Sequence, residues 1–150
     1  FDLLFKSVVY TTSLIVPKML KNKWGRIINV TSVSVKEPLN YLVLSNSIRS
    51  AVVAWAKSLS VDVGKDGVTV NSILTGYFDT ERIKDLNKEK SKSLNISEDE
   101  VLEKMKSLVP INRLGKTEEY GYLVSFLSSD KAAYINGTSI PIDGGLLKSF

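Results

Sequence analysis

The chain has 150 residues, of which 43% are hydrophobic and 24% charged, a composition typical of a globular domain and not of a disordered or fibrous chain. The sequence contains neither histidine nor cysteine, which excludes Ser-His-Asp and Cys-His catalysis, disulfides and metal sites built on those ligands. We therefore expect no metal site. Any proton transfer has to use Asp, Glu, Lys, Tyr, Ser or water.

The net charge of +4 does not point to nucleic acid. A nucleic-acid binder gathers its basic residues on one face with aromatic residues between them. The most charged stretch here, residues 81–106, holds seven basic and seven acidic side chains, which cancel. No apolar run is expected to reach transmembrane length and nothing resembles a signal peptide, so we expect no membrane contact and a cytoplasmic location.

Helices and short apolar strands alternate along the first half of the chain. Apolar residues at helical spacing predict a helix over residues 1–23, with Pro17 inside it. The β-branched segment 26–30 is typical of a buried parallel strand. A Ser-rich loop follows to residue 40, and a second amphipathic helix is predicted over residues 41–63.

The second half continues this alternation. Residues 68–74 predict another buried strand, and residues 139–142 predict a last one. Between them we expect a polar excursion over 77–95, a helix to about residue 108 that begins at a capping box of Ser97 and Glu100, and a helix to about residue 128 capped by Thr117.

This order of elements predicts an α/β fold with a doubly wound parallel sheet. Three strands preceded by a helix are few for such a fold. We therefore expect an exposed apolar edge on the first strand unless more chain or another subunit covers it. Because the sequence opens at Phe1 without a methionine and inside an amphipathic helix, we interpret the 150 residues as part of a larger protein.

The residues that follow the strands are the candidates for chemistry, because ligands of parallel sheets bind outside the carboxyl ends of the strands. These are segments 31–34, 74–77 and 143–145. On the helix after the first loop, Ser45 and Arg49 are four residues apart and share a face. A hydroxyl beside a fixed cation could act as proton donor or oxyanion clamp, although on spacing alone a solvated helix face is the simpler explanation.

Several ordered motifs resemble the short-chain dehydrogenase/reductase family. The segment GRIINVTS (25–32) resembles its fifth strand and catalytic-serine segment, and VTVNSI (68–73), followed by Gly76 and Thr80, resembles its sixth strand and cofactor loop. Two later motifs resemble the C-terminal segment of that family: RLG (113–115) with Glu118 and Glu119, and IDGG (142–145). The resemblance covers essentially the whole chain. It implies the C-terminal part of a Rossmann-like doubly wound sheet, with the dinucleotide-binding N-terminal half absent from this chain.

The catalytic set of the family is altered here. The resemblance assigns Ser32 to the catalytic serine, but Ser45 stands at the tyrosine position and Arg49 at the lysine position. Leu4 stands where the family often has an asparagine, and Thr75 replaces the proline before Gly76. A branch of reductase-like sequences with Leu-Ser-Asn-x-x-Arg at this place is similar to residues 44–49, which favours a lineage feature over random decay.

The resemblance implies an NAD(P)-dependent oxidoreductase that transfers a hydride between an alcohol and a ketone, such as a 3-oxoacyl or sugar-like substrate. Ser32, Ser45 and Arg49 would be catalytic, and Arg49, Gly76 and Thr80 would bind NAD or NADP. The Ser45 hydroxyl is a weaker acid than a phenol, whose pKa is about 10. We therefore expect a water held by Ser32, Ser45 and Arg49 to deliver the proton.

Other interpretations stay open. Tyr41 or Tyr77 could present a phenol to the site instead of packing. The altered tyrosine and lysine positions also fit a non-catalytic member that binds cofactor or acts as a scaffold. A small basic interaction module would need the 150 residues to fold alone, which the expected sheet edge argues against. The resemblance further implies a substrate lid over residues 77–108 and a homo-oligomer, a dimer or tetramer.

Overall fold

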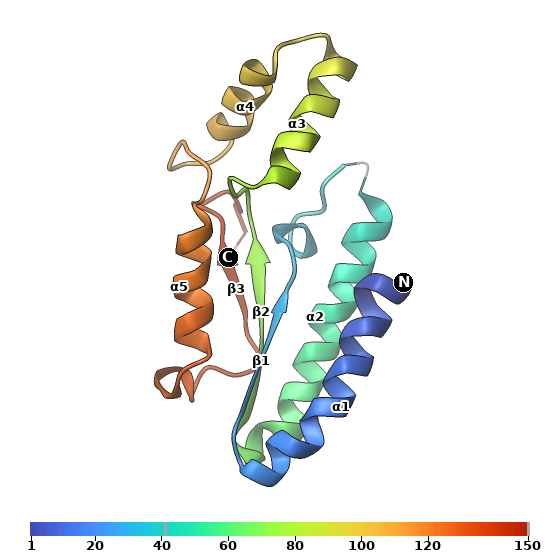
Figure 1. Cartoon of the computed structure of the whole chain (residues 1–150), viewed down its shortest axis with the longest axis vertical. Helices are drawn as coiled ribbons and strands as arrows, with labels where there is room; N and C mark the ends of the chain where they lie inside the picture. Colours follow the sequence, from blue (N-terminus) through green and yellow to red (C-terminus); the bar gives the residue numbers. More distant parts are fainter. Residues whose placement is uncertain (41, 150) are drawn as a thin grey trace.

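Three parallel strands form the centre of the structure, which is a computed structural model that describes residues 1–40 and 42–149 (Figure 1). The strands are β1 (Gly25–Val30), β2 (Val68–Thr75) and β3 (Ser139–Ile142), in the spatial order β1-β2-β3. Ile27 pairs with Val70 and Ile73 pairs with Ile140. The expected parallel α/β sheet is confirmed.

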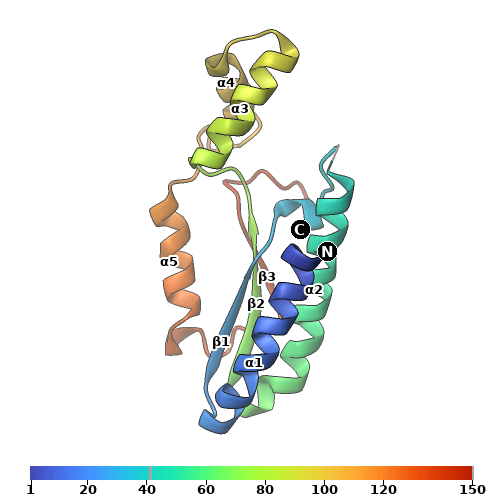
Figure 2. The same ribbon diagram turned by 45° about the vertical axis from the view of Figure 1, so that its right-hand side comes forward.

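Helices cover both faces of this sheet (Figure 2). α1 (Ser7–Asn22) and α2 (Val43–Val63) lie on one face, and α5 (Thr117–Leu127) lies on the other. α3 (Glu81–Leu94) and α4 (Glu98–Ser107) pair with each other beyond the carboxyl ends of the strands. The remaining elements are short: a π-helix at Asp2–Lys6 and 3-10 helices at Val33–Val35, Gly64–Asp66 and Asp130–Ala132.

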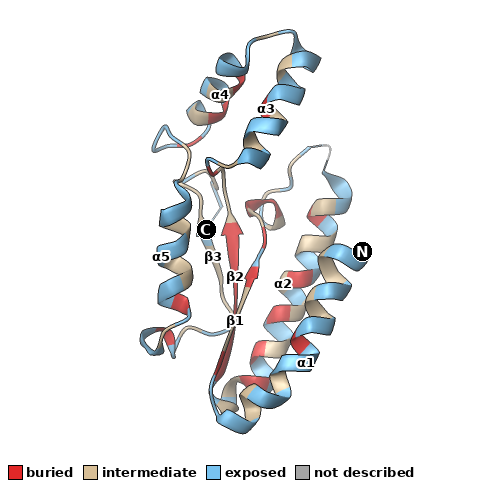
Figure 3. Cartoon of the chain, viewed as in Figure 1, coloured by how far each residue is buried: buried red, intermediate tan, exposed pale blue. Residues whose placement is uncertain are grey.

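β2 carries the core because it is covered on both faces (Figure 3). Side chains of a strand alternate between the two faces. Accordingly, Val68 and Val70 pack with Ala56 of α2, whereas Ile73 packs with Leu127 of α5. The apolar, β-branched sequence of this strand therefore reports burial on both sides.

The outer edge of β1 has no strand beside it in the described part of the chain. Val30, at the end of β1, is 61% exposed. This agrees with the expected uncovered apolar edge.

The first helix differs from its prediction at its start, which is the π-helix Asp2–Lys6. Its end agrees with the prediction: the last helical residue is Asn22, and Lys23 caps the helix in a left-handed conformation with a φ of 53°. We expected no segment of transmembrane length, but Asp2–Asn22 is long and apolar enough to cross a membrane by length and composition. Val16, Met19 and Leu20 of this helix pack against the core, so it forms one layer of the α/β fold.

Two helix starts test the capping predictions. The capping box of Ser97 and Glu100 is confirmed at the start of α4. Thr117 is not the cap of α5, because it is the first helical residue. The backbone N–H of Lys116 instead donates to the Glu119 carboxylate, at 2.8 Å. Tyr41, expected to open α2, lies outside the described residues.

Candidate active site at the carboxyl ends of the strands

Ser32 lies directly after β1 and starts a short loop. The backbone N–H and the hydroxyl of the preceding Thr31 both donate to the carbonyl of Ile73, at 2.9 and 3.0 Å. Ser32 has extended backbone angles, and its Oγ accepts a hydrogen bond from the N–H of Ser34, at 3.1 Å. This bond caps the 3-10 helix Val33–Val35. The half-buried Ser32 hydroxyl keeps its own proton to donate.

Ser45 and Arg49 are joined on α2. The guanidinium Nε of Arg49 donates to the Oγ of Ser45 at 3.3 Å, and both residues are half-buried. The expected shared helix face is therefore present. Because Ser45 accepts this bond, its hydroxyl proton is directed elsewhere, and the adjacent charge favours negative charge near the oxygen.

Arg49 also lines a cavity of about 100 Å³ between β1, α2 and the N-terminal helix. Asn29 of β1 lies in the same lining and is 7% exposed, and its side-chain nitrogen has no partner among the described residues. Leu4, at the position where the resemblance led us to look for an asparagine, lines the same cavity with an apolar side chain. A buried donor without an acceptor is costly, so this place suits an oxygen-bearing ligand.

Sequence reasoning did not single out Asn29 as a functional residue. The available signal is the amide that follows two isoleucines in the strand, because a polar side chain is rare at a buried strand position without a partner.

Gly76 and Thr80 form the next loop, after β2. The N–H of Gly76 donates to the carbonyl of Ile142 at 3.0 Å, and a Cβ at Gly76 would lie 2.6 Å from the Cα of Asp143. Only glycine fits this approach of two backbones. Thr80 is the N-cap of α3, and its Oγ1 accepts from the N–H of Ile83 at 3.4 Å. The helix N-terminus behind Thr80 is suited to negative charge.

Thr75 and Tyr120 form a second polar pair that sequence reasoning missed. Their hydroxyl oxygens lie 3.1 Å apart, although the residues are 45 positions apart in sequence. Burial raises the pKa of the Tyr120 phenol, while the hydrogen bond with Thr75 and the charge of Arg49 act in the opposite direction. The signal in the sequence was a hydroxyl residue, Thr75, at the position where the resemblance implies a proline, because a hydroxyl next to a buried strand needs a hydrogen-bond partner.

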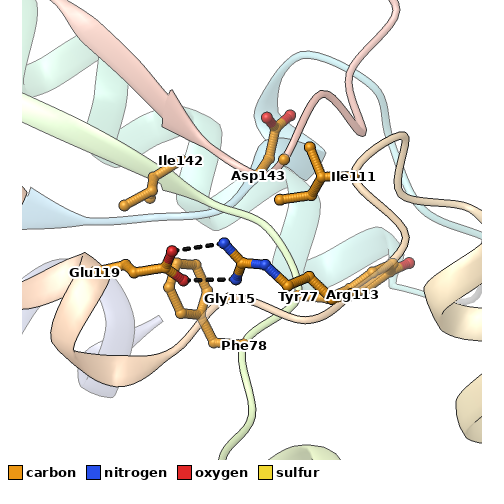
Figure 4. Close-up of a pocket in the computed structure, with 9 residues that line it drawn as sticks. Tyr77, Phe78, Ile111, Arg113, Gly115, Glu119, Ile142 and Asp143 are labelled. Atoms are coloured by element: carbon orange, nitrogen blue, oxygen red, sulfur yellow. Dashed lines mark hydrogen bonds and ion pairs between the residues drawn. The ribbon is translucent and has the colours of Figure 1, made fainter.

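A cavity of about 110 Å³ lies between the loop that follows β2 and helix α5 (Figure 4). Arg113 and Glu119 face each other in its wall and form a bidentate ion pair, at 2.8 and 2.7 Å. The guanidinium of Arg113 and the N–H of Lys116 lower the pKa of Glu119 to about 2. The pair thus holds the segment before α5 against the start of that helix.

Tyr77 follows Gly76 and lines this cavity. Burial raises the pKa of its phenol, so it is a weaker acid than a free tyrosine. Tyr41, the other tyrosine that could present a phenol to the site, is outside the described residues.

The side chains at these strand ends fit a nicotinamide dinucleotide. Asn29 and Arg49 supply hydrogen-bond donors at one cavity, and Thr80 stands at the N-terminus of α3, which is suited to negative charge. Hydroxyl, amide and phosphate oxygens are the acceptors that such donors bind.

Comparison with known proteins supports this assignment. A family model described as Enoyl-(Acyl carrier protein) reductase matches residues 1–147. The chain is 33% identical over 131 residues to the NADPH-dependent reductase BacG of Bacillus subtilis, covering 87% of this chain and 51% of that protein. It is also 33% identical over 144 residues to the 3-oxoacyl-[acyl-carrier-protein] reductase FabG of Buchnera aphidicola, covering 93% and 53%.

Solved structures agree. The L-sorbose reductase of Gluconobacter frateurii, complexed with NADPH and L-sorbose, matches with a TM-score of 0.87 and 30% identity over 95% of this chain and 54% of that chain. An actinorhodin polyketide ketoreductase with NADPH, 24% identical, shows the same fold with a TM-score of 0.91 over 97% and 57%. The chain spans about half the length of the proteins it matches.

Proposed function

Because this chain belongs to the Enoyl-(Acyl carrier protein) reductase family of short-chain dehydrogenases/reductases, we propose that its protein transfers a hydride between NAD(P)H and the carbonyl carbon of a ketone. The names of BacG and of the sorbose reductase structure both include NADPH, which supports a nicotinamide dinucleotide as the cofactor. The half-length match supports our proposal that residues 1–150 form the C-terminal portion of one Rossmann-like domain.

The hydrogen bond from Arg49 Nε to Ser45 Oγ is the observation that carries the proposal. It couples the two positions that replace the family's tyrosine and lysine. The Ser45 hydroxyl can then donate a hydrogen bond to the substrate oxygen, without giving up its proton, while the guanidinium stabilises the charge that develops there. Ser32 supplies a second hydroxyl donor from the loop after β1.

Arg49, Gly76 and Thr80 would hold the cofactor. Arg49 would bind ribose hydroxyls, Gly76 would let the cofactor loop pass close to Asp143, and Thr80 would contact the carboxamide or a phosphate beside the N-terminus of α3. The bound cofactor would supply the hydride.

Proton delivery would pass through water. Ser45 is too weak an acid to donate outright, because serine hydroxyls ionise far above the tyrosine pKa of about 10. Burial raises the pKa of the Tyr77 and Tyr120 phenols, which makes them poor replacements. A water held by Ser32, Ser45 and Arg49 would relay a proton from solvent to the substrate oxygen while Arg49 stabilises the developing charge, at some loss of rate.

A non-catalytic role is the alternative. The Ser32 oxygen already accepts a bond from Ser34, and the described phenols near the loop have raised pKa values. Both observations favour a protein that binds the cofactor without efficient turnover, as a sensor or a scaffold.

The test uses the natural full-length polypeptide. We expect NADPH or NADH to quench tryptophan fluorescence and to be oxidised with a panel of 3-oxoacyl, sugar and simple ketones. The 3-oxoacyl compounds and the sugars are chosen because FabG is a 3-oxoacyl-[acyl-carrier-protein] reductase and the Gluconobacter frateurii enzyme is an L-sorbose reductase. Absence of both quenching and turnover would exclude the oxidoreductase. If the protein binds nucleotide and only the S45Y/R49K double variant reduces ketones, the non-catalytic alternative holds.

Assembly and location belong to the same proposal. The surfaces of α1 and α2 expose Tyr10, Leu14, Val43 and Leu44, each more than 60% accessible. Exposed apolar side chains gathered on two helices support a homo-oligomer, a dimer or tetramer. The cytoplasmic location stays a part of the proposal that these side chains do not bear on. Light scattering of the full-length protein tests the oligomer, and a monomer at all concentrations would exclude it.

A further inference from the structure

Tyr120 of α5 contacts the loop after β2 from the side of the sheet opposite α2 (Figure 2). Its hydroxyl oxygen lies 3.1 Å from the Oγ1 of Thr75, the last residue of β2. Its ring meets the ring of Phe78, which is 7% exposed, edge to face, with centroids 5.3 Å apart and planes at 80°. One side chain therefore contacts the residue before Gly76 and a residue two positions after it.

The ring of Tyr120 is anchored in the core. It packs against the buried cluster that contains Ile73 and Leu127, whereas Tyr122, two residues later, is 72% exposed. Because this packing already restricts the ring, placing the hydroxyl beside the end of β2 costs little further conformational entropy. Tyr120 is thus a rigid connection between α5 and the end of the strand.

The middle of the same loop is held by backbone hydrogen bonds. The N–H of Gly115 donates to the carbonyl of Tyr77, and the N–H of Asp79 donates to the carbonyl of Gly115, each at 2.9 Å. The start of the loop is held by strand pairing with β3 and by the Tyr120 hydroxyl. Removing that hydroxyl should therefore loosen the start of the loop and leave its middle attached.

The hydroxyls of Thr75 and Tyr120 are each other's partners. Neither forms another hydrogen bond within the part of the chain that the structure describes. Burial raises the pKa of the Tyr120 phenol, so the phenol is protonated at neutral pH and either group can donate. The pairing needs a hydroxyl at residue 75, and the proline that the resemblance implies there has none. The contact therefore depends on a residue in which this chain departs from the family pattern.

The loop held in this way carries the two residues proposed above to bind the cofactor. Gly76 follows Thr75 directly, and Thr80 is the N-cap of α3. Glycine has the widest conformational freedom of all residues, so the loop at Gly76 needs contacts on both sides to keep one conformation. A loop that is already in its binding conformation binds its ligand more tightly, because less entropy is lost on binding.

We propose that Tyr120 is a positioning residue for the nicotinamide cofactor. Through the Thr75 hydroxyl and the Phe78 ring it holds residues 75–80 in the conformation that receives the dinucleotide, without touching the dinucleotide itself. This proposal rests on the cofactor role proposed above for Gly76 and Thr80, and it adds a residue of α5 to those that set cofactor affinity.

The binding experiment titrates the natural full-length polypeptide with NADPH and with NADH and follows tryptophan fluorescence. One ordinary hydrogen bond corresponds to about a fivefold change in an equilibrium constant, so Y120F and T75V should each raise the Kd of the tighter nucleotide about fivefold. T75S keeps the hydroxyl and should retain the parent Kd, and Y122F is the matched control on the same helix.

The Y120F/T75V double variant tests whether the two hydroxyls act together. It should bind the nucleotide no more weakly than either single variant, because both substitutions remove the same hydrogen bond. Additive losses in the double variant, or an unchanged Kd in both single variants, would overturn the proposal.

Kinetics separate positioning from a loss of folded protein. Y120F should raise the KM for the nucleotide about fivefold and leave kcat at saturating nucleotide unchanged, because the bound cofactor itself restores the loop conformation. A protein that is merely destabilised loses active enzyme, which lowers the apparent kcat at an unchanged KM. That second pattern would contradict a positioning role.

Hydrogen exchange in the cofactor-free protein distinguishes failure of this proposal from failure of the reductase activity. The amides of Gly76 and Asp79 are hydrogen-bonded, and in Y120F the Gly76 amide should exchange faster than in the parent and in Y122F. If the parent binds and oxidises the nucleotide while Y120F changes neither Kd nor exchange, the positioning role alone is refuted. If Y120F exchanges faster but the parent binds no nucleotide, the cofactor role and the reductase activity are refuted, and Tyr120 only orders the loop.

Discussion

The carboxylate of Glu37 holds the backbone of Ser149. Its Oε1 accepts hydrogen bonds from the N–H groups of Lys148 and Ser149, at 2.8 Å each. Glu37 belongs to the loop that begins at Ser32, so the C-terminal tail is attached to the segment that carries the proposed catalytic serine. Two residues more than 110 positions apart in sequence thus stabilise one corner of the site.

Replacing Glu37 should release the tail. In E37A the amides of Lys148 and Ser149 lose their acceptor, so their hydrogen exchange should be faster than in the parent protein. K36A, which changes the exposed neighbour, is the control and should leave both rates unchanged. Unaltered protection of the two amides in E37A would show that the carboxylate does not hold the tail.

The same attachment should weaken in acid. The two backbone hydrogen bonds lower the pKa of Glu37 below its usual 4.5. Their contribution is complete above that value and is lost as the pH falls through the lower, folded-state pKa. Exchange at Lys148 and Ser149, after correction for intrinsic rates, should therefore lose its protection below pH 4.5, and E37Q should lack this acid transition.

The Arg113–Glu119 pair should make stability depend on pH. Its pairing lowers the Glu119 pKa from 4.5 to about 2, so the stabilisation is complete above pH 4.5 and is lost as the pH falls toward about 2. The thermal midpoint of E119Q should lie below that of the parent at pH 7, and the gap should narrow at pH 3. E118Q, one residue earlier, should show no such narrowing; a gap in E119Q that stays constant would contradict the assignment.

Adding a methyl group at Gly76 should destabilise the protein. A Cβ there would lie 2.6 Å from the backbone of Asp143, so the loop after β2 or the turn after β3 has to move. Crowding of this kind costs about 1–3 kcal/mol.

Gly121 is the matched control, because a Cβ there meets no atom within 4 Å in the described structure. G121A should stabilise α5 by about 0.5–1 kcal/mol, since alanine favours a helix over glycine. Urea unfolding of both variants measures the difference. A G76A protein as stable as the parent would show that the two backbones are not held together.

Removing the Thr75 hydroxyl should raise the pKa of Tyr120 further. Burial already raises it, and the hydrogen bond with Thr75 acts against burial. In T75V the phenol keeps its burial and loses that bond. Ultraviolet titration of tyrosinate should show one tyrosine moving to higher pH, and the same step should be missing in Y120F. Y122F, which changes a 72% exposed tyrosine, should leave the shifted step in place.

The order of elements could be predicted from the sequence because each depends on local periodicity. The β-branched run of β2 and the capping box at Ser97 lie within a few neighbouring residues, and both are confirmed. The prediction of Thr117 as the N-cap of α5 was wrong. Thr117 has a side chain that can cap a helix, but the helix begins one residue earlier than expected, and the carboxylate of Glu119 accepts a hydrogen bond from the N–H of Lys116.

The candidate site also contains contacts that sequence spacing predicts and contacts that it does not. Ser45 and Arg49 are one helical turn apart, so their contact followed from spacing alone, and Gly76 followed from the motif after β2. Asn29 meeting Leu4 and Arg49 in one cavity requires a strand and two helices to pack together. The Thr75–Tyr120 contact joins the end of β2 to α5, 45 positions later in the chain.

The sequence by itself therefore determined the elements, their parallel order and the residues that follow each strand, because turns and hydrophobic patterns act over short distances. Only the tertiary structure decided which of these residues meet, which buried amides lack partners and which side chains line the same cavity. Those properties depend on packing between segments far apart in the chain, and no local pattern specifies such contacts.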